Sequence, residues 1–360
     1  MARRHQLWYQ LTVLVASTIA LSLSSCRSTS TTIAETDTSE VQQELEVVTT
    51  FLPMTQFTKA VAGERAQVIQ LLPTSVGPHD YQAKPADAQA IANADILVKN
   101  GLEMELFLDD LIENAGNANL LVIDSSEGIA TLASDHAEEE EDKHDHAHHD
   151  HDHEEEKEEK HHDHHDHGEF DPHIWLDPKR AIEQVENIRD GLIAVDPAGE
   201  DEYTANAQAY IEQLQALDTE ITQRLAPYAG QTFITFHDFV FYFADSYNLK
   251  AEFLVDIPEE NPSPEDVRRI IETTKQNNIK ALLTEPQVGD QAFASLAEDL
   301  QVKVTSFDPM EVGDSSAIQP ESYFTIMRQN LDSLEEAFGD SPQSWLIPQL
   351  FQLTFLETGV

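Results

Sequence analysis

The sequence predicts an α/β protein of two lobes, each a mostly parallel sheet flanked by helices. Short β-rich runs alternate with helical segments in two blocks of the chain, a pattern typical of βαβ units and a parallel sheet. A long amphipathic segment, 199–226, separates the two blocks and is predicted to be a connector helix. The length of 360 residues, 40% of them hydrophobic, is sufficient for two ordinary cores.

The first block, 46–198, is predicted to form the N-terminal lobe. Gly63 ends its first helical stretch, and Asp196-Pro197 ends its last one. Strands are expected at 47–51, 67–72, 94–100 and 119–124, and helices near 54–62, 85–93, 103–114 and 178–195.

The connector is predicted to be one helix, and the second block, 227–340, is predicted to form the C-terminal lobe. Apolar residues recur at helical spacing along the connector, at Tyr203, Tyr210, Leu214, Leu217, Ile221 and Leu225. In the second block Ser263 precedes Pro264, with Asp266 three residues after the cap, which predicts a helix start. The C-terminal lobe is expected to have strands at 232–236, 252–257, 279–285 and 302–307, and helices at 239–247, from 264, at 291–300 and at 322–338.

The N-terminus has the form of an export signal. Arg3 and Arg4 precede a short apolar run that ends in Leu-Ser-Ser-Cys, and Cys26 is the only cysteine of the chain. This resembles the bacterial lipoprotein signal, in which the cysteine is acylated and anchors the protein to the membrane; a simply cleaved signal peptide is the alternative. We therefore predict a signal peptide at 1–26, an extracytoplasmic location and no disulfide. A flexible tether is expected at 27–45, and the apolar tail 341–360 has no assigned role.

A tract of histidine and acid dominates the segment 135–169. It has no apolar period and its acids repel one another, so a disordered insertion in the N-terminal lobe is predicted. Histidine-rich tracts are typical of metal binding, whereas a solvated charge run could use Glu and Lys alone. Of the 16 histidines in the chain, only His5, His79, His173 and His237 lie outside the tract. The auxiliary weak metal sites are expected at His136, His144, His146, His148, His149, His151, His153, His161, His162, His164, His165 and His167.

The charge balance excludes one class of partner. A formal net charge of −46 argues against nucleic acid, because neutralising phosphates requires Lys and Arg. The charge suits a protein that faces cations, but acidity alone identifies no partner.

Three of the histidines outside the tract lie next to predicted elements. His79 comes just past a strand, His237 directly follows one, and His173 stands in the motif DPHIWLDP after the tract. Glu285 and Asp308 also follow strands. Ligands of open α/β sheets bind beyond the carboxyl ends of strands. Any one of these residues alone is best interpreted as an ordinary polar residue at a strand end, but together they predict a metal site between the lobes.

These motifs resemble those of the metal-binding lipoproteins and periplasmic solute-binding proteins of bacterial ABC importers, specifically the zinc-uptake branch. The resemblance runs from about Val47 to Phe338. It depends on PHDYQAKPAD, DPHIWLDP, FHDFVFYFADSYNL, and TEPQ with FDP, in that order, together with the His-rich insertion. The resemblance implies two α/β lobes, a rigid helical connector and a buried metal at the interface. It also implies delivery of that metal to a membrane permease and its ATPase, by a protein that we expect to be a monomer.

The resemblance also implies the ligands. Carried over onto this chain they are His79, His173 and His237, with Asp308 as the fourth ligand and Glu285 or water as alternatives. Manganese and iron carriers of the family place a carboxylate where this chain has His237. Imidazoles suit zinc, whereas carboxylate-rich sites suit manganese. Transported Zn²⁺ is therefore expected, and a manganese or iron carrier is an alternative.

Two further classes of function remain as alternatives. Three histidines with an open or water position also build a zinc hydrolase, but no HExxH helix and no nucleophile motif is present. We therefore expect that the protein is not an enzyme. A non-transporting surface zinc buffer or adhesin would use the tract without needing the three structured histidines.

Overall fold

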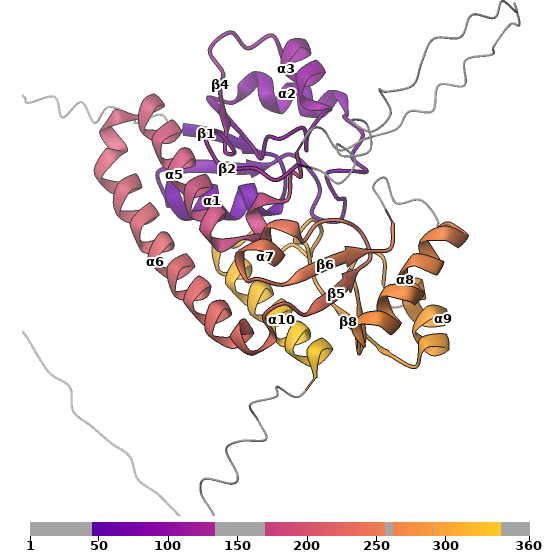
Figure 1. Cartoon of the computed structure of the whole chain (residues 1–360). Helices are drawn as coiled ribbons and strands as arrows, with labels where there is room; N and C mark the ends of the chain where they lie inside the picture. The colour runs from indigo at the N-terminus through magenta and orange to yellow at the C-terminus, as the bar shows by residue number, and fades with distance from the viewer. Residues whose placement is uncertain (1–44, 134–169, 256–261, 290, 340–360) are drawn as a thin grey trace, which may run out of the picture. The chain divides into compact units, whose positions relative to one another are not determined.

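Two four-stranded parallel sheets with the same strand order form the framework of the protein (Figure 1). The computed structural model describes residues 45–133, 170–255, 262–289 and 291–339. The strand order is β2-β1-β3-β4 in the first sheet and β6-β5-β7-β8 in the second, and all pairs are parallel. The predicted fold class, two α/β lobes joined by a long helix, is confirmed.

The first lobe alternates strands with short helices. Its strands are β1 (Leu45–Thr49), β2 (Ala66–Gln70), β3 (Ile96–Lys99) and β4 (Leu121–Asp124), and its helices are α1 (Leu52–Ala62), α2 (Pro85–Asn93) and α3 (Leu108–Ala115). The helix predicted from residue 103 begins only at Leu108, because Leu102 and Glu103 have positive φ angles of 53° and 61° that no α-helix accommodates.

Two helices lead from the first lobe to the second. The 3-10 turn η1 (Ile174–Leu176) precedes α5 (Pro178–Val195), and α6 (Glu200–Leu225) packs along α5 (Figure 1). Asp177 caps α5 by accepting a hydrogen bond from the Lys179 amide, and Pro178 occupies the first helical position. The apolar positions that predicted α6 are all buried.

The second lobe repeats the alternation. Its strands are β5 (Thr232–Thr235), β6 (Lys250–Phe253), β7 (Ala281–Thr284) and β8 (Lys303–Ser306), and its helices are α7 (Phe241–Ser246), α8 (Pro264–Asn277), α9 (Gln291–Leu300) and α10 (Pro320–Phe338). The hydroxyl of Ser263 accepts hydrogen bonds from the amides of Glu265 and Asp266, so the predicted start of α8 is confirmed.

One hydrophobic cluster extends through both lobes. It contains Val47 of the first sheet, Phe233 and Leu283 of the second, and the buried faces of α1, α5, α6 and α10. Within this cluster the ring of Phe57 on α1 contacts the ring of Tyr323 on α10, with 5.2 Å between the centroids. The two sheets therefore belong to a single compact unit, and each sheet also packs in a smaller cluster within its own lobe.

Several predicted segments lie outside the described residues. They are the signal segment 1–26 with Cys26, all but the last residue of the tether 27–45, the histidine-rich insertion 135–169 and the tail 341–360. Among the helices of the described residues, none has both the length and the apolar character that crossing a bilayer requires.

Candidate metal centre

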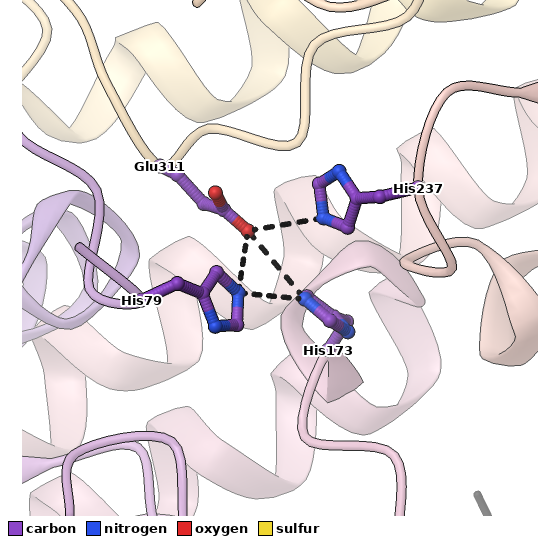
Figure 2. Close-up of side chains that lie close together, drawn as sticks. All are labelled: His79, His173, His237 and Glu311. Atoms are coloured by element: carbon purple, nitrogen blue, oxygen red, sulfur yellow. Dashed lines mark hydrogen bonds and ion pairs between the residues drawn. The ribbon is translucent and has the colours of Figure 1, made fainter. Parts of the chain in front are cut away.

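Three imidazoles and one carboxylate converge on a single point (Figure 2). His79 lies in the loop between β2 and α2, and His173 stands directly before η1. His237 follows β5, and Glu311 lies in the loop after β8. In the second sheet the strand order reverses between β5 and β7. His237 therefore lies at the position where open parallel sheets bind ligands.

Four of the six distances between the ligand atoms match the edges of a tetrahedral metal site. Glu311 Oε1 lies 3.3 Å from His79 Nε2, 3.5 Å from His173 Nε2 and 3.6 Å from His237 Nε2, and the Nε2 atoms of His79 and His173 are 3.3 Å apart. All four atoms lie within 4.8 Å of one another. A tetrahedron with zinc–nitrogen bonds of about 2.0–2.1 Å has edges of about 3.4 Å, so the gap between these atoms accommodates one such ion.

The centre is closed on one side and open on the other. The side chains of His173 and His237 are 0% and 1% exposed, and that of Glu311 is 4% exposed, whereas that of His79 is 13% exposed. His79 and Glu311 also line a cavity of about 340 Å³. The cavity is formed by Ser75, Val76, Gly77, His79, Asp80, Gln287, Glu311 and Val312.

Carboxylates fix the two buried rings. Asp171 Oδ1 lies 2.7 Å from His173 Nδ1 and accepts a hydrogen bond from the His173 amide at 2.9 Å. Glu285 makes the same pair of contacts with His237, at 2.6 Å to Nδ1 and 3.0 Å from the amide. A carboxylate at Nδ1 holds the proton there and turns Nε2 toward the metal. Apart from the ion pair with Glu311 Oε1 at 3.6 Å, the buried His237 Nε2 has no hydrogen-bond partner in the described part of the chain.

The histidines and carboxylates of the centre shift one another's pKa values. Burial by itself lowers the pKa of His173, but Asp171 and Glu311 outweigh it and raise that pKa to about 9. Burial likewise opposes the charge of His237, yet Glu285 and Glu311 raise its pKa well above the ordinary value. Burial raises the pKa of Glu311, but the three imidazoles, His79 foremost, hold it well below its usual value. Without metal, the centre therefore holds protons on buried imidazoles beside an ionised carboxylate.

The carboxylate beside the histidines is Glu311, which the sequence analysis did not single out. Neither Asp308 nor Glu285 belongs to the converging group. Asp308 Oδ1 accepts a hydrogen bond from the Met310 amide at 2.7 Å, so this carboxylate is used within its own turn. Met310 has a φ angle of 62° and reverses the chain, which carries Glu311 to the histidines. The sequence feature that could have indicated Glu311 is Asp308-Pro309 directly after a strand. This pair is typical of a turn, so the ligand is expected after the turn rather than within it.

Glu285, the second choice for the fourth ligand, contacts His237 rather than the point of convergence. Its Oε2 also accepts a hydrogen bond from Gln287 Nε2 at 2.7 Å, so both of its oxygens have partners. Glu285, expected as an alternative fourth ligand, lies outside the group of converging atoms, and its carboxylate contacts the Nδ1 side of the His237 ring.

Fold and site together define a class: a two-lobed α/β protein with a buried candidate site for a divalent transition metal. Residues 47–337 match the protein family described as zinc-uptake complex component A, periplasmic. The chain belongs to this family, as its motifs predicted.

Named relatives agree with this assignment. The chain is 32% identical over 297 residues to the high-affinity zinc uptake system protein ZnuA of Bacillus subtilis, covering 82% of this chain and 88% of that protein. It is 31% identical over 329 residues to the zinc-binding lipoprotein AdcA of Streptococcus pneumoniae, covering 91% of this chain and 60% of AdcA. The crystal structure of Zn(II)-bound AdcA from the same organism superposes with a TM-score of 0.65 at 28% identity, over 83% of this chain and 59% of that one. The chain therefore spans about 60% of the length of AdcA.

Proposed function

We propose that this protein captures Zn²⁺ outside the cytoplasm and delivers it to an ABC-type permease and its ATPase. The observation that carries the proposal is the set of three imidazole nitrogens and one carboxylate oxygen, all within 4.8 Å of one another. Neutral imidazoles with one oxygen are a preferred ligand set of zinc. Membership of the zinc-uptake family supports the same cargo.

We propose His79, His173, His237 and Glu311 as the zinc ligands, with Glu311 in the role for which the sequence suggested Asp308. Four protein ligands complete a tetrahedron. Catalytic zinc sites leave one position for water, whereas closed sites hold the metal without activating water. The closed ligand set therefore favours a carrier over a zinc hydrolase.

The remaining parts of the proposal concern location and partners. Anchoring through a lipid on Cys26 would keep a monomeric carrier at the membrane, close to its permease. The histidine-rich tract, 135–169, would bind further zinc ions at many weak sites, in addition to the structured one. Orienting carboxylates at His173 and His237 serve a structured metal site, which a buffer that binds zinc through the tract alone would not need, so the carrier is favoured.

A paired substitution tests the ligand set. We expect Glu311→Gln to weaken zinc binding by about a hundredfold, because an ionised ligand is lost from a buried site. Asp308→Asn serves as the matched control, since it changes a neighbouring carboxylate that lies outside the converging group. Zinc affinity of the full chain would be measured by competition with a chelator of known affinity. Loss of affinity in Asp308→Asn with Glu311→Gln unaffected would reverse the assignment, and a wild-type chain with no tight zinc site would refute the function.

Metal choice gives a second test. Zinc exceeds manganese at most N/O sites, so the wild-type preference alone discriminates weakly. We expect His237→Glu to lower zinc affinity and to narrow the gap between zinc and manganese, because a carboxylate replaces an imidazole at a ligand position. Both affinities would be measured by the same chelator competition. Unchanged affinities for both metals would exclude His237 as a ligand and reopen the manganese alternative.

A further inference from the structure

Side chains from both lobes donate hydrogen bonds to the backbone of the turn that carries His173. Asn100 Nδ2, at the end of β3 in the first lobe, donates a hydrogen bond to the Pro172 carbonyl at 2.9 Å. Tyr242 of α7 in the second lobe donates from its hydroxyl to the Asp171 carbonyl at 2.7 Å. The two residues that precede His173 are therefore fixed from opposite sides.

Tyr242 itself is fully buried and firmly placed. Its ring is 0% exposed and packs against Ile129 and Ile174. The guanidinium of Arg180 lies over the same ring, 4.5 Å from its centroid. Burial raises the pKa of Tyr242, so its hydroxyl keeps its proton and remains a donor.

The hydroxyl of Tyr242 links two segments of the chain, one at Leu132 and the other at Asp171. Besides donating to Asp171, it accepts a hydrogen bond from the Leu132 amide at 3.1 Å. The Asp171 amide donates to the Leu132 carbonyl at 3.2 Å, and Ala133 pairs with Phe170 in an antiparallel bridge. A single oxygen thus satisfies one backbone donor and one backbone acceptor, and it sets the position of Asp171.

We infer that Tyr242 is a positioning residue for the metal centre, which acts on His173 through Asp171. Asp171 Oδ1 contacts both the amide and Nδ1 of His173, so a displacement of the Asp171 backbone moves the ligand ring. Metal ligands must be held to within about 0.5 Å. The chain of contacts runs from the Tyr242 hydroxyl to the Asp171 carbonyl, then from the Asp171 carboxylate to His173. The inference rests on the proposed zinc function of His173.

The test is Tyr242→Phe in the full chain, with zinc affinity measured by chelator competition. Phenylalanine keeps the buried ring and removes only the hydroxyl. Groups that support metal ligands typically contribute 10- to 100-fold to metal affinity, so we expect a loss of about tenfold for this more remote group. Tyr210→Phe is the matched control, because the buried Tyr210 also donates to a backbone carbonyl, that of Pro320 at 3.1 Å. The control should lose thermal stability but retain its zinc affinity.

A double-mutant cycle separates positioning from a general structural effect. If Tyr242 acts through Asp171, Tyr242→Phe should weaken binding little further in an Asp171→Asn background. Additive losses would overturn the inference. So would a Tyr242→Phe affinity within twofold of wild type, or equal losses in Tyr242→Phe and Tyr210→Phe.

Two outcomes remain to be distinguished. A wild-type chain that does not bind zinc refutes the proposed function itself, before any comparison with Tyr242→Phe. If Tyr242→Phe does not fold, replacement of Tyr242 by 4-aminophenylalanine retains a donor in the same place and should bind zinc like wild type. A folded 4-aminophenylalanine variant with the full tenfold loss would overturn the inference.

Discussion

The two buried histidines of the centre differ from the third in how they are held. His173 and His237 are fully enclosed, and each has a carboxylate against Nδ1 and its own amide. His79 lies on the loop between β2 and α2, is partly exposed, and borders a cavity of about 340 Å³. One half of the site is thus enclosed and held by carboxylates, whereas the other half borders a cavity. We expect zinc to enter and leave on the His79 side.

Removal of single ligands should give the largest difference in zinc affinity between the two halves of the site. Structural zinc sites bind with about 10–16 kcal/mol, so one of four ligands contributes roughly 3 kcal/mol, or about a hundredfold. His173→Ala and His237→Ala should lose at least this much, because each also leaves a carboxylate buried without its partner. His79→Ala should lose only about tenfold, since water from the cavity can replace the ring.

Chelator competition for affinity and stopped-flow release of zinc for the dissociation rate would measure this difference. In His79→Ala we expect release to be accelerated. An equal loss of affinity in His79→Ala and His173→Ala would remove the distinction between the halves.

The pH dependence of zinc affinity should be set by the two buried histidines, His173 and His237. The pKa of His173 is raised to about 9 and that of His237 is also raised, so zinc must displace protons from both rings at pH 7. Zinc affinity should therefore begin to fall as pH drops below about 9, rather than near the ordinary imidazole pKa of about 6.5.

The metal-free protein should show the opposite trend in stability. A histidine pKa that is raised on folding adds stability that is fully present below the unfolded value of about 6.5. This contribution is lost as pH rises through about 9. Melting temperatures with and without zinc between pH 6 and 9 would test both trends, and a zinc affinity that stays constant over this range would contradict histidine ligation.

Deletion of the histidine-rich tract should have the smallest effect on the tight site. The four proposed ligands all lie outside the tract, on the two folded lobes, so its deletion removes none of them. We expect deletion of Asp135 to His167 to change the tight affinity by less than about twofold and to remove the extra, weaker zinc equivalents. Equilibrium dialysis would count the bound ions, and uptake in cells should suffer mainly when zinc is scarce. Loss of the tight site on deletion, with His79→Ala harmless, would place the main site in the tract.

The fold was predictable where local signals mark both ends of an element. The helix predicted at 178–195 is present as Pro178–Val195, because Asp177-Pro178 starts it and Asp196-Pro197 ends it. The helix predicted from residue 103 was wrong at its start, since the positive φ angles of Leu102 and Glu103 leave no trace in the hydrophobic pattern. Hydrophobic periodicity predicts which face of a helix or strand is buried, but it does not predict the backbone angles of a turn.

The ligands of the candidate site could also be predicted only in part from the sequence. The motifs predicted His79, His173 and His237, and the structure brings these three together. The fourth position depends on a reversal of the chain at Met310, which uses Asp308 for the turn and leaves Glu311 to face the histidines. Two carboxylates three residues apart after one strand cannot be ranked from sequence, because their roles depend on the backbone path of the turn that joins them.

The hydrophobic cluster shared by the two lobes has a consequence for how the protein melts. Phe233 and Leu283 of the second sheet lie in the same cluster as Val47 of the first, and α10 closes back on α1. The shared cluster couples the packing of the two lobes, although each sheet also packs in a cluster of its own, so we expect heat to unfold the chain in a single cooperative transition. For the same reason, a fragment cut after α6 would expose the apolar face that α10 covers, and it should aggregate instead of folding as an independent domain.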